Sequence, residues 1–177
     1  MILLGLSGKK RSGKNTVAKL IATMTPLRVK EFAFADPLKD EVCKACGVSR
    51  KILEENKDNF RLILQGWGTD FRRRMYDDSY WINKAMKLLH TSSVVKDEAD
   101  ICVFTDVRFK NEASILKQID GVIVRVKREP SLGDDHPSEI DMDDFKCDFE
   151  LDNTSTLNNL ASSVQMLLHR LKIPMKK

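Results

Sequence analysis

The chain has 177 residues, of which 42% are hydrophobic and 32% charged, and its formal net charge is +4. This apolar content excludes a disordered chain, and no apolar run comes near the ~20 residues that a membrane-spanning helix needs. Four cysteines and an apolar start without a basic leader favour a reducing, cytoplasmic compartment. We therefore expect a single domain over residues 1–177 and no membrane partner.

The chain alternates short aliphatic runs with stretches of helical periodicity. In chain order, the spacing predicts a strand at 2–6, a helix at 13–23, a strand at 29–34, and a helix that Asp36 caps and that ends at Gly47. Residues 49–90 indicate two or three helices with breaks at 66–68 and 77–79. Strands follow at 101–105, 122–126 and 149–151, with helices at 109–118 and 156–171. This order is typical of an α/β fold with a parallel sheet covered on both faces.

One polar, irregular stretch, residues 129–148, contains three of the chain's most turn-prone residues, namely Pro130, Gly133 and Pro137. Long loops in compact α/β domains are usually functional, so we expect a lid there.

Residues 8–14, Gly-Lys-Lys-Arg-Ser-Gly-Lys, fit the phosphate-loop pattern G-x-x-x-x-G-K between a predicted strand and a predicted helix. The glycines let successive N–H groups point inward, and Lys14 is expected to reach the β- and γ-phosphates of a nucleotide. Asn15 follows Lys14, and the first hydroxyl belongs to Thr16. Either Asn15 or Thr16 could meet the shell of a bound metal ion. The order Lys-x-Thr is closer to small nucleotide-kinase loops than to GTPase loops.

A carboxylate, Asp106, stands at the end of the predicted strand 101–105. Ligands of doubly wound sheets lie outside the carboxyl ends of the strands, so Asp106 could hold Mg²⁺ through water. The alternative is that Asp106 only caps the helix that follows Arg108.

A transferase that acts on a phosphorylated acceptor needs fixed cations for both phosphates. Three groups outside the phosphate loop qualify: residues 72–74, which are all Arg, then Arg108, and then Arg125 with Arg128. Arg108 is the best candidate because it follows a strand, and Arg128 could be a lid arginine or a solvated surface residue. Because 12 of the 30 basic residues lie in the phosphate loop and in the segments 72–74, 108–110 and 125–128, the charge pattern indicates an acidic protein with a concentrated phosphate-binding cleft.

Four further blocks accompany the loop: Phe-Ala-Asp-Pro-Leu-Lys at 34–39, Gly-Trp-Gly-Thr-Asp at 66–70, Asp-Val-Arg-Phe-Lys-Asn-Glu-Ala at 106–113 and His-Pro-Ser-Glu at 136–139. In this order and spacing, the sequence resembles the deoxynucleoside monophosphate kinases of large DNA phages and related viral proteins over nearly its whole length. The resemblance implies a three-layer P-loop kinase fold of the adenylate kinase type, with a parallel five-stranded sheet flanked by helices and a lid segment. It implies transfer of the ATP γ-phosphoryl group to a (deoxy)nucleoside 5′-monophosphate, with Mg²⁺.

The resemblance also assigns residues. The implied ATP-binding residues are Gly8, Lys9, Arg11, Ser12, Gly13, Lys14, Asn15 and Thr16. The implied acceptor-binding residues are Asp36, Lys39, Trp67, Arg72, Arg73, Arg108, His136, Ser138 and Glu139, with a helical acceptor region at about 47–92. Catalytic roles fall to Lys14, Arg108, Arg128 and Asp36, and the metal site to Thr16 and Asp106.

A second family, the animal-type phosphomevalonate kinases, is similar over the same span. It shares the loop pattern S-G-K-x-x-S-G-K, a Pro-Leu-Lys block and a Trp-Gly followed by Arg, so mevalonate 5-phosphate is the alternative acceptor. A third interpretation is a non-catalytic, nucleic-acid-binding P-loop protein. It is disfavoured because no basic run lies outside the ligand loops, so we expect small-molecule nucleotides as partners and no stable nucleic-acid complex. A homodimer is compatible with the sequence, and a viral source would place the protein in the host cytoplasm.

Overall fold

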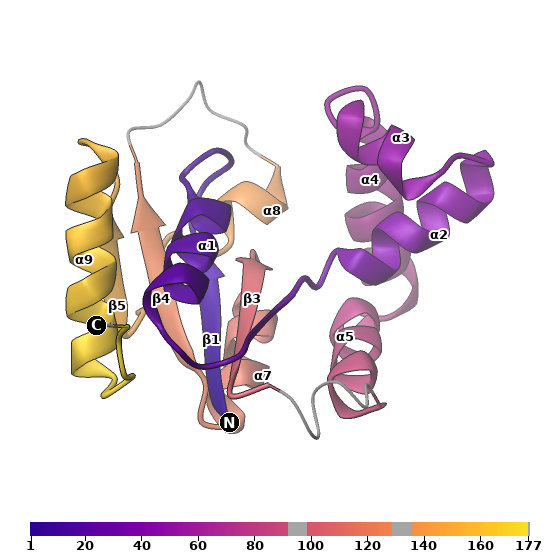
Figure 1. Cartoon of the computed structure of the whole chain (residues 1–177). Coiled ribbons are helices and arrows are strands. Elements are labelled where there is room, and N and C mark those ends of the chain that lie inside the picture. Colours follow the sequence, from indigo (N-terminus) through magenta and orange to yellow (C-terminus); the bar gives the residue numbers. More distant parts are fainter. Residues whose placement is uncertain (92–98, 129–135, 177) are drawn as a thin grey trace. The chain divides into compact units, whose positions relative to one another are not determined.

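The computed structural model describes residues 1–91, 99–128 and 136–176. They belong to two compact units, one formed by Met1–Phe32 with Ser92–Lys177 and the other by Ala33–Thr91. The first unit holds every strand, and the second is helical (Figure 1). Of the lid expected at 129–148, residues 129–135 lie outside the described part of the chain. Within that part, no helix is long and apolar enough to cross a membrane.

The first unit is built on a parallel sheet of five strands. The strands are β1 (Ile2–Ser7), β2 (Val29–Phe32), β3 (Ile101–Val107), β4 (Val122–Lys127) and β5 (Phe149–Asp152). Their order is β2-β3-β1-β4-β5, and each neighbouring pair is parallel. The predicted α/β fold with a five-stranded parallel sheet is therefore confirmed. Because β1 is central, the loop that follows it leaves the sheet between the ends of β3 and β4.

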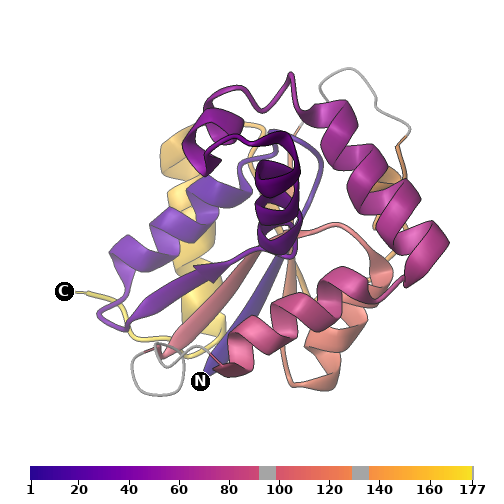
Figure 2. The same cartoon turned by 90° about the vertical axis from the view of Figure 1, so that its right-hand side faces the viewer.

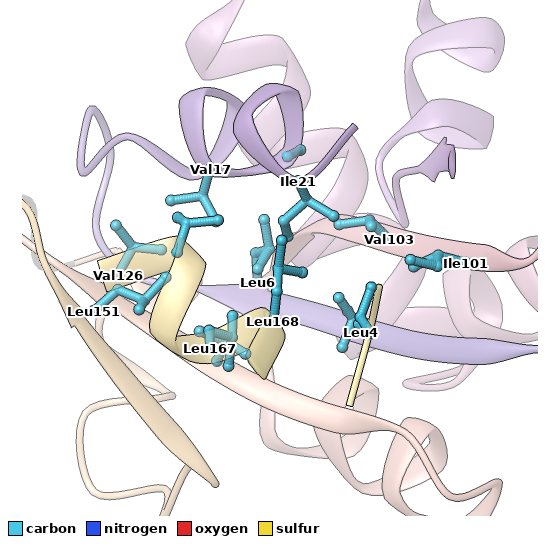
Figure 3. Packing of buried hydrophobic residues seen from close by; sticks show 14 of the residues in the cluster. Leu4, Leu6, Val17, Ile21, Ile101, Val103, Val126, Leu151, Leu167 and Leu168 are labelled. Carbon is cyan, nitrogen blue, oxygen red and sulfur yellow. The ribbon is translucent and has the colours of Figure 1, made fainter. Parts of the chain in front are cut away.

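Helices cover both faces of this sheet. On one face α1 (Lys14–Met24) and α9 (Leu157–Arg170) pack against the strands, and Val17, Ile21 and Leu168 are fully buried among them (Figure 3). On the other face lies α7 (Lys110–Gln118), whose Leu116 packs so closely that a Cβ added at Gly5 would lie 2.8 Å from its Cδ1. The three-layer arrangement follows from apolar residues at helical spacing on α1, α7 and α9.

The second unit consists of helices joined by short turns (Figure 2). They are α2 (Asp36–Cys46), α3 (Arg50–Glu55), α4 (Arg61–Gln65), the π-helix η1 (Gly66–Tyr76) and α5 (Tyr80–Thr91). Local capping explains two of the boundaries. The Oγ of Ser49 accepts a hydrogen bond from the N–H of Ile52 at the start of α3. Gly47 ends α2 in the left-handed conformation that favours glycine.

The break predicted at residues 66–68 is wrong, because α4 continues directly into η1. Gly66 has ordinary helical dihedral angles. Gly68 is needed for close packing instead, since a Cβ there would lie 2.7 Å from the Cδ2 of Leu38 in α2. The glycines therefore permit contact between helices and do not end one.

The predicted cap of α2 is also wrong. The N-cap residue is Ala35, and Asp36 is the first residue of the helix. The Asp36 carboxylate accepts a hydrogen bond from the Nη2 of Arg50 at 2.5 Å, so an ion pair takes the side chain that would otherwise cap the helix.

Truncation of the buried face of α9 should destabilise the first unit. Leu168→Ala leaves a cavity between α9 and the sheet, and we expect a loss of about 2–5 kcal/mol in the free energy of unfolding, measured by urea denaturation. The matched control is Met166→Ala on the same helix, where 61% of the side chain is exposed and the loss should stay within about 0.5 kcal/mol. Equal losses for the two variants would contradict this packing.

Candidate phosphate-binding site

The loop between β1 and α1 has the backbone that the sequence predicts. Gly8 and Gly13 adopt φ angles of 138° and 102°, which L side chains rarely adopt. Space is limiting too: a Cβ at Gly8 would lie 2.4 Å from the carbonyl oxygen of Val126, and one at Gly13 would lie 2.3 Å from the Nδ2 of Asn153. The N-cap residue of α1 is Gly13, which has no side chain to cap the helix, so the first N–H groups of α1 and its positive dipole end suit a phosphate.

Lys14 is buried in the curve of this loop. Its Nζ donates to the carbonyl oxygens of Gly8, at 2.6 Å, and Lys9, at 2.8 Å. On the other side, the Nδ2 of Asn153 donates to the carbonyl oxygen of Ser12 at 2.8 Å. Sequence reasoning missed Asn153, because it follows β5 and lies 141 residues from Ser12. These contacts place the Lys14 ammonium inside the loop, where the phosphate-loop motif predicts that phosphate oxygens bind.

Asp106 and Arg108 lie at the same edge of the sheet as the loop. Asp106 is the penultimate residue of β3, which pairs with β1 in a register that sets Val107 opposite Ser7. The alternative role of Asp106 as a helix cap is excluded, since the N-cap of α7 is Phe109. Topology therefore brings the predicted metal ligand toward the phosphate loop.

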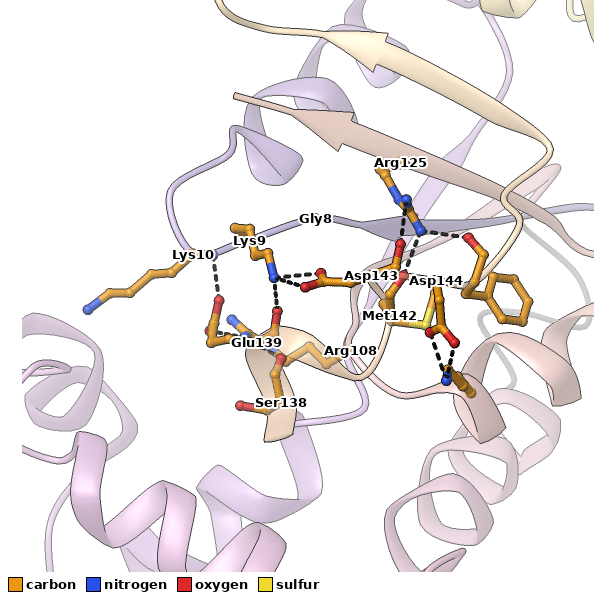
Figure 4. A network of polar contacts seen from close by, with 12 residues as sticks. Gly8, Lys9, Lys10, Arg108, Arg125, Ser138, Glu139, Met142, Asp143 and Asp144 are labelled. Carbon is orange, nitrogen blue, oxygen red and sulfur yellow. Dashed lines mark hydrogen bonds and ion pairs between the residues drawn. The ribbon is translucent and has the colours of Figure 1, made fainter. Parts of the chain in front are cut away.

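A short helix, α8 (Pro137–Ile140), is bound to the loop through Glu139 (Figure 4). One carboxylate oxygen of Glu139 accepts the N–H of Lys10 at 2.8 Å, and the other forms an ion pair with Arg108. Burial would raise the pKa of Glu139, but the charge of Arg108 and the Lys10 N–H keep it below its usual value. Lys9 adds hydrogen bonds to the Glu139 carbonyl oxygen, at 2.6 Å, and to Asp143, at 2.5 Å. The Glu139 carboxylate is thus hydrogen-bonded to a backbone N–H group of the phosphate loop.

The other residues predicted for this region have different positions. His136 caps α8, because its Nδ1 accepts the N–H of Ser138. The Nη2 of Arg125 donates to the carbonyl oxygens of Met142 and Phe145, both at 2.6 Å, so this guanidinium holds the segment after α8. Arg128 is exposed at the end of β4. A cavity of about 140 Å³ lies among these groups, and it is lined by Ser7, Gly8, Lys9, Val107, Arg108, Arg125, Val126, Lys127, Arg128, Ser138, Glu139, Met142 and Asp143.

The predicted acceptor residues Asp36, Lys39, Trp67, Arg72 and Arg73 all belong to the helical unit. The Nζ of Lys39 lies 2.7 Å from a carboxylate oxygen of Glu54. Arg73 is buried and forms an ion pair with Asp78 at 3.3 Å.

Trp67 and Arg72 are brought together by Glu41, which sequence reasoning missed. One oxygen of Glu41 accepts the Nε1–H of Trp67 at 3.1 Å and the Nη2–H of Arg72 at 2.9 Å. These partners lie 26 and 31 residues from Glu41, a spacing that carries no local signal. Two of the predicted acceptor residues, Trp67 and Arg72, are thus bound to the same carboxylate, that of Glu41.

Among the residues that the structure describes, no group of three or more His, Cys, Asp or Glu side chains could hold a metal ion. Cys43 and Cys46 both lie on α2 as free thiols. Thr16 and Asp106 stay predicted ligands of a metal ion.

A central strand, a glycine loop around a buried lysine and a helix N-terminus on a parallel sheet define a P-loop nucleotide-binding protein. The sequence model of the phosphomevalonate kinases matches residues 6–121. The chain therefore belongs to the phosphomevalonate kinase family of P-loop kinases.

Two viral relatives resemble almost the whole chain. A protein of Acanthamoeba polyphaga mimivirus, whose name assigns it provisionally to the deoxynucleotide monophosphate kinases, is 30% identical over 93% of this chain and 94% of its own length. The deoxynucleoside-5′-monophosphate kinase of Escherichia phage T5 is 24% identical over 78% of this chain and 84% of its own. Among solved structures, shikimate kinase from Aquifex aeolicus aligns with 97% of this chain and 96% of its own at 17% identity and a TM-score of 0.45. The resemblance to viral deoxynucleotide kinases and to phosphomevalonate kinases is confirmed.

Acid should remove a specific contribution of Glu41 to stability. Burial would raise the pKa of Glu41, but hydrogen bonds from Lys84, Tyr80, Trp67 and Arg72 hold it at about 2, below its ordinary value of 4.5. Because the folded state favours the carboxylate, this stabilisation is complete above pH 4.5 and disappears as the pH falls toward 2. In Glu41→Gln the side chain cannot titrate. The difference in urea midpoint between wild type and variant should therefore shrink from pH 6 to pH 3. A difference that is constant over this range would refute the assignment.

Proposed function

We propose that the protein transfers the γ-phosphoryl group of ATP to a (deoxy)nucleoside 5′-monophosphate and releases the two diphosphates. The observation that carries the proposal is the phosphate loop. Its carbonyl oxygens bind the Lys14 ammonium, and it leads directly into the N-terminus of α1, so both can neutralise a phosphate bound at the loop. The viral relatives support the choice of acceptor by their names.

An aromatic cluster in the helical unit favours a nucleotide acceptor. The guanidinium of Arg72 lies 5.1 Å from the ring centroid of Phe71, 5.9 Å from that of Tyr76 and 4.7 Å from that of Tyr80. Phe71 and Tyr76 are 48% and 70% exposed, so their rings can meet a ligand. Exposed aromatic rings suit a planar base, whereas mevalonate 5-phosphate has no ring to stack. The family match over residues 6–121 keeps mevalonate 5-phosphate as the second candidate.

The chemistry proposed is in-line transfer, in which the protein mainly positions groups and neutralises charge. Lys14 and the loop N–H groups would stabilise the transferring phosphoryl group, and Arg108 would bind the acceptor phosphate. No general base is needed, because the attacking phosphate oxygen is already anionic. Arg128 as a lid arginine and Asp36 beside the acceptor remain predictions.

Mg²⁺ suits the donors that the chain offers. The hydroxyl of Thr16, in the first turn of α1, and the carboxylate of Asp106 are hard oxygen ligands, and both are partly exposed. One or two protein oxygens are the usual protein contribution to a Mg²⁺ site beside substrate phosphates, so this pair of donors would suit that ion. When bound, Mg²⁺ supplies charge neutralisation between the donor phosphates. Thr16 and Asp106 would hold and orient it.

The acceptor should be identified by turnover. Mg-ATP is incubated with each of dAMP, dGMP, dCMP, dTMP and mevalonate 5-phosphate, and ADP release is measured. We expect at least one nucleotide to be phosphorylated and mevalonate 5-phosphate to be inert. Turnover of mevalonate 5-phosphate alone selects the second candidate. Turnover of none removes the kinase proposal, and binding of polynucleotides with a steep salt dependence would then support the nucleic-acid-binding interpretation.

Removal of the loop ammonium should abolish transfer without unfolding the protein. Lys14→Ala loses the group that would neutralise the phosphates, so kcat should fall by about 100-fold or more. Lys19→Ala removes an exposed lysine from the same helix and should leave kcat unchanged. Circular dichroism checks that both variants are folded. Retained turnover in Lys14→Ala would contradict the role given to the loop.

A further inference from the structure

Glu41, on α2, receives hydrogen bonds on both carboxylate oxygens. Its Oε2 accepts from Trp67 and from the Nε and Nη2 of Arg72, the latter two at 3.1 and 2.9 Å. Its Oε1 accepts from the hydroxyl of Tyr80 and the Nζ of Lys84, both at 2.6 Å. Only 18% of the Glu41 side chain is exposed. One carboxylate therefore joins α2, η1 and α5.

The contact with Glu41 determines which edge of the Arg72 guanidinium is left for a ligand. Glu41 occupies the edge of the guanidinium that carries Nε and Nη2, while the rings of Phe71 and Tyr80 lie near the group. Among the residues that the structure describes, the Arg72 side chain donates hydrogen bonds through Nε and Nη2, and its Nη1 group donates none. A guanidinium held by one edge can still offer donors to an anion from the other.

The charges around Glu41 do not cancel. Arg72 and Lys84 carry two positive charges against the single negative charge of Glu41, so the cluster keeps one net positive charge. Its surface is aromatic, because Phe71 and Tyr76 are exposed. A net cation beside exposed rings suits a ligand that combines an anionic group with a flat ring.

We infer that Glu41 is a positioning residue for the acceptor: it holds Arg72 in the orientation that binds the nucleoside monophosphate. The inference rests on the proposed function. Without this carboxylate, Arg72 regains its rotamer freedom, and binding must then order it at an entropic cost. Glu41 does not touch the reacting atoms, so its loss should change acceptor binding and not the chemical step.

The test compares Glu41→Gln with Asp70→Asn. Asp70 is an exposed carboxylate on the same helix as Arg72, and its partner is Arg74 at 2.8 Å, so it controls for loss of a charge in this region. For Glu41→Gln we expect the acceptor KM to rise by about tenfold, while kcat and the KM for ATP stay within about twofold. Asp70→Asn should leave all three values unchanged. An unchanged acceptor KM in Glu41→Gln, or equal effects in both variants, would overturn the inference.

A double-mutant cycle separates positioning from general destabilisation. If Glu41 acts through Arg72, adding Glu41→Gln to Arg72→Met should weaken acceptor binding by less than twofold beyond Arg72→Met alone. Additive effects would show that Glu41 acts by another route and would overturn the inference. Thermal melts confirm which variants are folded at the assay temperature.

Calorimetric titration with the best nucleoside monophosphate keeps this test separate from the proposed function. Tight binding by wild type and about tenfold weaker binding by Glu41→Gln support the positioning role even if no phosphoryl transfer is seen. That result without turnover would remove the proposed transfer and leave the inference standing. Absence of monophosphate binding by wild type would overturn both.

Discussion

The structure depends on one constraint, which is that the loop after β1 must turn its amides and the Lys14 ammonium toward the same small volume. Left-handed backbone at Gly8 and Gly13 makes this turn, and no side chain fits at either position. The surrounding sheet serves the same constraint. Because β1 is central, the Val126 carbonyl of β4 closes against Gly8, and Asn153 after β5 holds the loop from its far side. The fold thus explains why distant strands contribute to a loop of seven residues.

The basic side chains of this protein are concentrated in a few segments, and several of them also form ion pairs with carboxylates. The sequence pattern indicates basic segments gathered around phosphates, and the structure gives several of them a carboxylate partner. Arg108 forms an ion pair with Glu139, Lys9 with Asp143, and Arg72 with Glu41. A phosphate approaching these cations therefore competes with, or shares them with, fixed carboxylates. Of these pairs, Lys9 with Asp143 is exposed, whereas the carboxylate of Glu139 is buried beside Arg108, and each pair restrains the cationic side chain.

Local patterns predicted the sheet and the phosphate loop, since strand alternation, helical periodicity and the spacing of two glycines depend on residues near each other in sequence. They failed where a distant group decides. Gly66 and Gly68 resemble a helix break, but Leu38 explains why Gly68 must lack a side chain. Asp36 resembles a cap, but Arg50 takes its carboxylate. The role of Glu41 could not be predicted either, because its partners come from two other helices and no residue near it in sequence signals them.

The two candidate acceptors share a phosphate and differ in the rest of the molecule, so the phosphate loop cannot discriminate between them. Discrimination must come from groups that sense a ring, and in the described residues exposed aromatic side chains gather around Arg72 in the helical unit. The family match covers residues 6–121, which include the whole helical unit, so it does not by itself select one acceptor. Because Phe71 and Tyr76 belong to the helical unit, we expect that changes at these residues can alter the choice of acceptor while the phosphate loop keeps its structure.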